Sequence, residues 1–437
     1  MPSPWLLSTI IFARGVVMGR LKIVYPICCG VDVHRDFLIA CIASTNPQGV
    51  TEYQSRRFST YTGNLRELRD WLLSNQCKDV CMESTGKYWF PIHNILEDSC
   101  HVVVSHPKFV KAIKGKKTDK KDAQWIADLF KHDLVRGSFI PPKDIRQLRD
   151  LCRYWVKLSS YMTGEKNRAQ NCLTVSNFKL DDVFSNVFGK SASAITTQLL
   201  EHPGEPFDVT PFVHGRCKTP IAQIQEAVDG IFTHEQAEKL KIIRSHMDSL
   251  EMHKAELESL ILDIAQAYLP QVELLLTVPG ISDAFTAIRI LAEIGADMSV
   301  FETSKHLCSW AGLTPQNAES AGKKKTTRIG KSGAYLKPLL IQVALAASRS
   351  EKHPEIYGKK NALQKRRGKK KAIVAIARRL LTAIYHILSK NEPYAPAAYT
   401  KVDMPPMARH ISQEKAFELL ARMGYILSDP LSHPLSG

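Results

Sequence analysis

The sequence is poor in the features that mark several large classes of protein. Its 23 glycines among 437 residues are too few for a collagen-like repeat, and its 44% apolar residues argue against global disorder. The ten cysteines form no CxxC pair and no Cys/His group at zinc-finger spacing. We therefore expect buried, reduced thiols in a cytoplasmic protein. At roughly 100 to 200 residues per domain, the length predicts two or three domains.

Signals for membranes and export are also scarce. No uninterrupted apolar run approaches the roughly 18 residues that span a bilayer. The apolar stretch 5–13 lacks a basic region before it and an A-x-A-like cleavage site after it, which argues against a secretory signal. Met18 stands directly before the first expected strand, so we expect residues 1–20 to be an extension outside the fold. No membrane partner is expected.

Positive charge is in excess, with 59 Lys and Arg against 43 Asp and Glu and a formal net charge of +16. Basic residues make up seven of fourteen positions over 108–121, five of nine over 323–331 and eight of thirteen over 359–371. Single charge runs are often only solvated faces, but three in a cationic chain favour a track for nucleic acid. The candidate nucleic-acid-binding residues are Lys114, Lys116, Lys117, Lys120, Lys121, Lys323, Lys324, Lys325, Arg328, Lys331, Lys365, Arg366, Arg367, Lys369 and Lys370.

The order of β-rich and helical segments predicts an α/β domain over 21–143. We expect strands over 21–34, 37–43, 51–58, 79–82 and 101–104, and helices over 65–73 and 88–97. A helical region over 144–270 and a mainly helical domain over 271–390 follow, and then a Pro-rich linker and tail over 391–437. The Pro279-Gly280 turn resembles a helix-hairpin-helix unit that offers backbone N–H groups to a phosphate, so Gly280 is a further nucleic-acid candidate. The alternative is a plain packing turn.

A heptad seam runs along the expected helix from Leu240 to Tyr268, where apolar residues recur at alternating spacings of three and four with one polar interruption, Lys254. Two interpretations fit this pattern. The seam could pack against the helix expected over 144–173 of the same chain, or it could join two subunits as a coiled coil.

Four acids stand where catalytic carboxylates are often found. Asp32 interrupts an apolar strand, Glu83 directly follows another, and Asp119 and Asp122 are spaced by three at the start of a helix beside the first lysine cluster. Singly, each has a structural interpretation, as a helix cap, a first-turn acid or a loop end. Together they favour two-metal phosphodiester chemistry, in which ions about 3.5–4 Å apart bind the attacking and leaving oxygens.

The loop that follows Gly312 places Ser320 beside a lysine cluster. A serine there can attack a phosphodiester if a base or metal takes up its proton. The structural alternative is a helix cap or a simple phosphate contact.

Taken in order, these motifs resemble the DEDD transposases of bacterial insertion sequences, also called bridge-RNA-guided recombinases. The likeness runs from about residue 30 to residue 388 and depends on the set rather than on any one motif. The motifs are GVDVH at 30–34, MESTG at 82–86, KTD at 117–119 with DA at 122–123, KNR at 166–168, VPGI at 278–281, LAEIG at 291–295 and AGLTP at 311–315.

The resemblance implies a RuvC-like catalytic domain of the RNase H type, a coiled-coil region and a C-terminal transposase domain. It further implies that Asp32, Glu83, Asp119 and Asp122 hold Mg²⁺, two ions per site, and that Ser320 forms a phosphoserine link to DNA. The usual Ser-Gly pair is here Ser320-Ala321-Gly322, so Ser332, which precedes Gly333, is the alternative nucleophile.

We therefore expect an enzyme that excises and inserts its own element by breaking and rejoining strands. Its expected partners are donor DNA, target DNA, a structured bridge RNA and further copies of itself, as dimers that pair into a tetramer in a bacterial, nucleoid-associated setting. One alternative is a metal-dependent Holliday-junction nuclease that uses only the acids. The other is a non-catalytic basic protein that binds nucleic acid.

Overall fold

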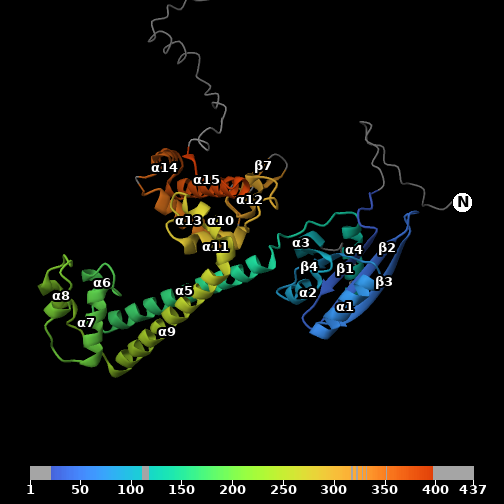
Figure 1. The fold of residues 1–437 in the computed structure, drawn as a ribbon. Coiled ribbons are helices and arrows are strands. Elements are labelled where there is room, and N and C mark those ends of the chain that lie inside the picture. Colours follow the sequence, from blue (N-terminus) through green and yellow to red (C-terminus); the bar gives the residue numbers. More distant parts are fainter. Residues whose placement is uncertain are drawn as a thin grey trace, which may run out of the picture. The chain divides into compact units, whose positions relative to one another are not determined.

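The protein is described here by a computed structural model, which covers residues 21–110, 118–315, 318–320, 323–326, 328–330, 332–350 and 352–396, with backbone alone at 318–320 and 323–326. The chain divides into two compact units between Pro141 and Pro142, and each is described by itself (Figure 1). Lys114, Lys116, Lys117 and Lys331 lie outside the described residues, as do residues 1–20 and 397–437. The finer domain limits given above stay predictions.

The first unit is built on a mixed sheet of five strands in the order β3-β2-β1-β4-β5. The strands β1, β2 and β3 form an antiparallel meander, and β4 and β5 run parallel to β1. The predicted α/β character of this domain is thereby confirmed. The strands are β1 (Ile27–Val33), β2 (Phe37–Thr45), β3 (Thr51–Ser59), β4 (Asp79–Glu83) and β5 (His101–Ser105).

Helices cover both faces of this sheet. On one face, α1 (Thr62–Ser74) and α2 (Trp89–Leu96) bury their leucines and isoleucines against alternate strand residues such as Val31 and Met82. On the other face, α4 (Asp119–Lys131) packs over Cys28 and Cys81. Successive strand residues point to opposite faces, so residues an even number of positions from Cys28 or Cys81 face α4.

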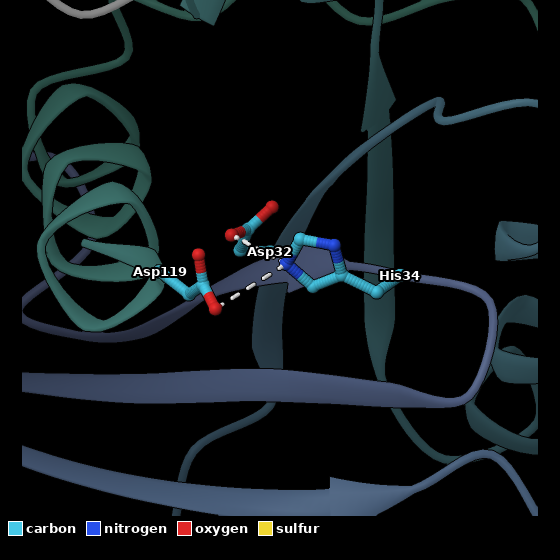
Figure 2. Close-up of side chains that lie close together, drawn as sticks. All are labelled: Asp32, His34 and Asp119. Atoms are coloured by element: carbon cyan, nitrogen blue, oxygen red, sulfur yellow. Dashed lines mark hydrogen bonds and ion pairs between the residues drawn. The ribbon is translucent and has the colours of Figure 1, made fainter. Parts of the chain in front are cut away.

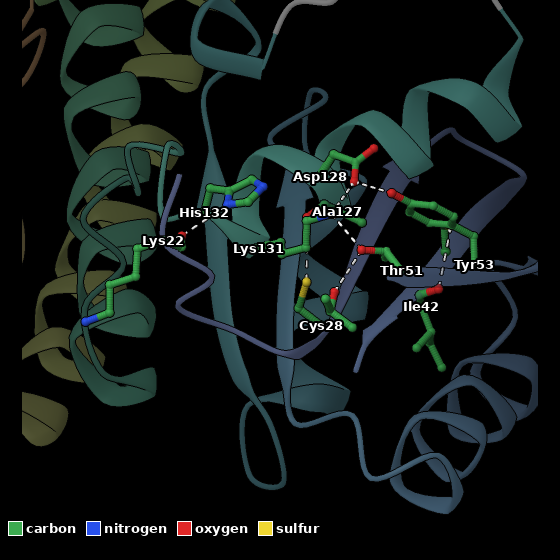
Figure 3. Close-up of polar contacts among 11 residues, drawn as sticks. Lys22, Cys28, Ile42, Thr51, Tyr53, Ala127, Asp128, Lys131 and His132 are labelled. Atoms are coloured by element: carbon green, nitrogen blue, oxygen red, sulfur yellow. Dashed lines mark hydrogen bonds and ion pairs between the residues drawn. The ribbon is translucent and has the colours of Figure 1, made fainter. Parts of the chain in front are cut away.

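Gly30 allows α4 to lie close to β1. A Cβ atom there would meet Ala123 O at 2.2 Å and Ala127 N at 2.3 Å, so only glycine permits this approach. Near the C-terminal end of α4, Asp128 accepts a hydrogen bond from the Tyr53 hydroxyl at 2.5 Å and another from the buried Lys131 ammonium at 2.9 Å (Figure 3). These contacts fasten α4 to the sheet and thereby fix where its first turn lies. A short helix, α3 (Pro107–Val110), precedes it.

The first strand is shorter than the sequence predicts. It begins at Ile27 rather than Leu21, because the backbone N–H groups of Val24 and Tyr25 both donate to Lys131 O at the end of α4. His132 also bonds Lys22 O, as Figure 3 shows. This segment therefore pairs with the end of α4 before the chain enters the sheet.

The second unit begins with two long helices, α5 (Lys143–Val175) and α9 (His234–Ala265), that run in opposite directions. Trp155 donates to Glu258 at 2.6 Å, while Leu158 and Met162 pack on Leu250. The heptad seam of α9 therefore faces α5 of the same chain, which is the internal alternative. Between them lie α6 (Leu180–Val183), α7 (Lys190–Glu201), a short 3₁₀ turn (Thr210–Phe212) and α8 (Ile221–Ala227).

A helical body with one small hairpin completes the second unit, and the predicted mainly helical character is confirmed. Its elements are a 3₁₀ turn (Gln266–Tyr268), α10 (Leu269–Leu276), α11 (Ala284–Ile294), α12 (Ser304–Trp310), β6 (Ala318–Ser320), β7 (Lys323–Thr326), α13 (Leu336–Ala347), α14 (Pro354–Arg367) and α15 (Lys369–Lys390).

The turn between α10 and α11 is packed against a neighbouring helix. Gly280 has a φ of +86°, and a Cβ atom on it would lie 2.2 Å from Val343 O in α13. The glycine is thus required for packing, which matches the plain structural interpretation of this turn. Phosphate binding by Gly280 stays a prediction.

Two stretches, His234–Leu276 and Lys369–Lys390, are long and apolar enough to cross a membrane by length and composition alone. Both have packing partners in the structure. The seam of α9 is buried against α5, and the apolar face of α15 contacts α10, α12, α13 and α14. Such helices are equally typical of the interior of a folded protein.

All ten cysteines are free thiols, and all except Cys217 are buried. The prediction of buried, unpaired thiols is therefore confirmed for nine of them. Burial raises the pKa of the Cys28 and Cys81 thiols to about 12, so both stay protonated near neutral pH.

Candidate functional site

The site begins at the ends of two neighbouring parallel strands. Val31 of β1 pairs with Met82 of β4, so the next residues, Asp32 and Glu83, stand side by side at the edge of the sheet. Both lie an even number of residues from a cysteine that packs on α4, so both face that helix. Asp32 is buried, whereas Glu83 is half-buried and accepts a hydrogen bond from Thr85 at 3.4 Å.

The first turn of α4 supplies the other two acids. Thr118 is the N-cap, and its hydroxyl accepts from Lys121 N at 3.4 Å, so the capping role considered for Asp119 is wrong. Asp119 and Asp122 are therefore free of that role and lie in the turn that Gly30 holds close to β1. Acids are favoured there by the helix dipole as well.

Three side chains converge at this point, as Figure 2 shows. His34 Nε2 lies 3.2 Å from Asp32 Oδ2 and 3.9 Å from Asp119 Oδ2. One ligand atom from each of the three lies within 4.8 Å of the others, which is close enough for a single metal ion. Glu83 and Asp122 lie outside this group of three.

The electrostatics of Asp32 connect the group to the fourth acid. Burial raises the pKa of the Asp32 carboxyl, the nearby His34 opposes this effect, and Asp122 and Asp119 raise the pKa further through like charge. Asp122 thus acts on Asp32 through its charge. A cation placed between Asp32 and its acidic neighbours would therefore stabilise the ionised form of Asp32.

Sequence reasoning identified the acids but missed His34. The signal was present, because His34 lies two residues after Asp32 and side chains two apart in a strand lie on the same face. Only the structure shows that the His34 ring, which follows the end of β1, lies 3.2 Å from Asp32 and 3.9 Å from Asp119.

The two candidate nucleophiles lie in the second unit. Ser320 is the last residue of β6 and pairs with Lys323 of β7 in a small hairpin; its side chain is outside the described part of the structure, as are those of Lys323, Lys324 and Lys325. Ser332 is exposed, and its carbonyl accepts from the Lys337 ammonium at 2.9 Å. Roles for either serine stay predictions.

The remaining basic candidates are at the surface. Lys120 and Lys121 are exposed in the first turn of α4, beside the acids. Lys365, Arg366 and Arg367 are exposed in the last turn of α14, and Lys369 and Lys370 are exposed in the first turn of α15. Arg328 is exposed as well.

The donor set fits a divalent metal ion. Carboxylate oxygens are ligands of Mg²⁺ and Mn²⁺, and here the buried Asp32 lies near the acidic Asp119 and Asp122. Asp32, His34 and Asp119 are close enough to share an ion, and Glu83 and Asp122 border the same place.

Two family models match the chain. One, described as a transposase with a DEDD domain of the IS110 type, covers residues 29–177. The second, described as a transposase of the IS116/IS110/IS902 family, covers residues 272–358. The first contains all four acids, and the second contains Ser320 and Ser332.

Individual relatives match a shorter segment. The chain is 37% identical over 123 residues to a pilin gene-inverting protein of Moraxella bovis, which is 28% of this chain and 38% of that protein. It is 33% identical over 123 residues to the transposase for insertion sequence element IS1111A of Coxiella burnetii, 27% of this chain and 33% of that protein. The match thus spans about two fifths or less of each curated relative.

The similar solved structures include one with a low overall superposition score. It is that of Thermus thermophilus RuvC, with 13% identity and a TM-score of 0.22, covering 26% of this chain and 99% of that protein.

Proposed function

Since the chain carries both domains of the IS110-family transposases, we propose that it is a DNA transposase that excises and inserts an insertion sequence by cutting and rejoining strands. The observation that carries this proposal is the convergence of Asp32, His34 and Asp119 within the first of the two matched domains. The similar Moraxella protein is named for inverting a gene, which also requires strands to be cut and rejoined.

The proposed metal site uses Asp32, Glu83, Asp119 and Asp122, with Mg²⁺ as the expected ion and two ions per site. When bound, the metal supplies Lewis-acid stabilisation to the phosphodiester oxygens. The chain's own residues shape the site: Gly30 brings α4 near the sheet, Thr118 caps that helix, and the hairpin turn aims the His34 ring at the acids.

The proposed nucleophile is Ser320. Its Oγ would form a bond to phosphorus and break one P–O bond of the DNA backbone, while the released DNA hydroxyl takes up the proton. The hydroxyl of an incoming strand then reverses the step. Because the phosphodiester bond energy is kept in the protein–DNA link, no nucleotide cofactor is needed.

Nucleic acid would bind along the exposed basic residues. Lys369 and Lys370 lie in the first turn of α15, where cations are unfavourable for the helix dipole, so their presence favours binding over stability as the reason for them. We propose donor and target DNA as substrates and a structured bridge RNA as the guide, in the bacterial cytoplasm at the nucleoid.

We also propose that subunits pair into dimers and then a tetramer on DNA, because two element ends require at least two active sites. Leu250 is buried against α5, so a charge there would disrupt the chain's own helix pair. Ile242 of α9 is 69% exposed and offers a cleaner test. Ile242→Asp should lower the molecular mass of the DNA complex by light scattering; an unchanged mass would remove this face of α9 from the contact.

A labelled-DNA assay tests the proposed activity. Wild-type protein with Mg²⁺ should give a covalent protein–DNA adduct, and mass spectrometry should locate the DNA on the peptide that contains Ser320. Ser320→Ala should bind DNA but form no adduct, whereas the matched control Ser332→Ala should retain it. DNA linked to Ser332 instead would overturn the choice of nucleophile.

The same assay tests the acids. Asp32→Ala, Glu83→Ala, Asp119→Ala and Asp122→Ala should each lower strand transfer by about 100-fold or more, because even partners outside the ligand shell are worth 10–100-fold. Binding of nucleic acid should persist in each variant. Full activity in any two of them would remove those acids from the site.

A metal-dependent nuclease is the second candidate, favoured because Asp32, His34 and Asp119 converge within the first unit. It would release nicked DNA with no protein attached and would not need Ser320. Free nicked product from Ser320→Ala at the wild-type rate would support it.

A further inference from the structure

The imidazole of His34 faces two carboxylates of the candidate metal site. Its Nε2 lies within 3.2 Å of Asp32 and 3.9 Å of Asp119, and the two carboxylates reach it from different elements, β1 and α4 (Figure 2). The nitrogen therefore lies at the meeting point of the two acids.

The direction of the ring does not depend on the acids alone. His34 N donates to Phe37 O across the β1–β2 turn, and the imidazole stacks on the Phe37 ring with centroids 4.5 Å apart. The Arg57 guanidinium of β3 lies 4.0 Å from the centroid of the same phenyl ring. This stack over three strands holds the imidazole in place, so its nitrogen is preorganised toward the site.

Ligand chemistry then favours particular ions. Four carboxylates alone form an oxygen site that suits Mg²⁺, which keeps near-octahedral oxygen and water ligands. An imidazole nitrogen suits first-row transition ions, and affinity at a nitrogen-containing site rises from Mn²⁺ onward in the series. A site with two acids and one imidazole therefore binds Mn²⁺ better than an all-carboxylate site would.

We propose that His34 is a direct ligand of one metal ion and raises the affinity of that position for Mn²⁺, while Mg²⁺ still binds through the carboxylates. The inference rests on the metal site of the proposed function and adds a nitrogen ligand to it. The ion that supports strand transfer best would then be set by a residue outside the four acids.

The test is calorimetric titration of the full chain with Mn²⁺ and, separately, with Mg²⁺. His34→Gln should raise the Kd for Mn²⁺ by about 10- to 100-fold. The Kd for Mg²⁺ should change by less than about threefold, because Mg²⁺ gains little from nitrogen. His101→Gln is the matched control: this exposed histidine bonds Asp79 at 2.9 Å at the other end of the same sheet, and its loss should change neither constant.

A spectroscopic measurement avoids dependence on the variant's folding. Pulsed electron paramagnetic resonance of wild-type protein loaded with Mn²⁺ should show coupling to one imidazole ¹⁴N, and His34→Gln should lack it. Absence of nitrogen coupling in the wild type would overturn the proposal. An equal rise of the Kd values for Mn²⁺ and Mg²⁺ in His34→Gln would overturn it as well.

Asp32→Asn separates this inference from the proposed function. If Asp32→Asn loses both ions while His34→Gln changes neither constant, the metal site stands and the role of His34 fails. If the wild-type chain binds neither ion, the metal site itself is wrong and both proposals fail together.

Discussion

At the scale of single residues, Gly30 decides how close a helix comes to the sheet. Gly30→Ala should destabilise the first unit by about 1–3 kcal/mol or more, because its Cβ would overlap backbone atoms of α4 that cannot move as a side chain does. Thermal or urea unfolding of the full chain measures this. Gly63→Ala is the control, since nothing lies within 4 Å of a Cβ there. Equal effects of the two changes would contradict the close packing.

Asp32 carries a charge that the fold disfavours. Asp32→Asn should raise the Tm of the metal-free protein near pH 7, because the amide removes a desolvated negative charge near Asp119 and Asp122. Strand transfer should fall at the same time, which is a trade of function against stability.

The pH dependence of this effect follows from the raised pKa of Asp32. A carboxyl whose pKa is higher folded than unfolded stabilises the fold when protonated, and that contribution is lost as pH rises through the folded pKa. The Tm advantage of Asp32→Asn should therefore be small below pH 3.8, the usual value, and grow above it. An advantage that is largest in acid would contradict this assignment.

At the scale of elements, one ion pair joins α5 to α11. Glu293 is buried and accepts two hydrogen bonds from Arg153, at 2.7 and 2.8 Å, while Arg149 donates to the last carbonyls of α11. Burial lowers the pKa of Arg149 to about 10, which the nearby Glu293 opposes. The glutamate of the LAEIG motif is thus a structural acid in this unit.

Glu293→Gln should destabilise the second unit by about 1.5–3 kcal/mol, because the buried glutamate is the counter-charge of Arg153, whose side chain is 40% exposed and can partly turn to water. Glu238→Gln breaks an exposed pair with Lys241 and should change the stability little, because solvent screens the two charges. Denaturant unfolding with tryptophan fluorescence compares them. A small loss in Glu293→Gln would show that Arg153 finds water instead.

At the scale of the whole molecule, the net charge of +16 governs association with nucleic acid. Each neutralised phosphate of duplex DNA contributes roughly −0.9 to the slope of log K against log salt. Changing Lys365, Arg366, Arg367 and Lys369 to Ala should flatten that slope by up to about 3–4. An unchanged slope and affinity would show that this cluster is only a solvated face.

The element types of both units could be predicted because each depends on local pattern. The alternating runs of the first unit and the apolar helix over 284–294 are visible in the sequence itself. The end of an element could not be predicted where a residue far away in the sequence determines it. The first strand does not begin at Leu21, because Val24 and Tyr25 pair with the end of α4 instead of the sheet.

Which residues meet could be predicted only in part. The sequence determined four acids at strand ends and a helix start, a basic surface and a family of related motifs. Tertiary structure alone decided that Gly30 brings α4 onto β1, that the α9 seam faces α5, and that His34, between β1 and β2, lies beside Asp32 and Asp119. The physical reason is that chemical type and periodicity are local, whereas the approach of two backbones and the direction of one ring depend on groups far apart in the chain.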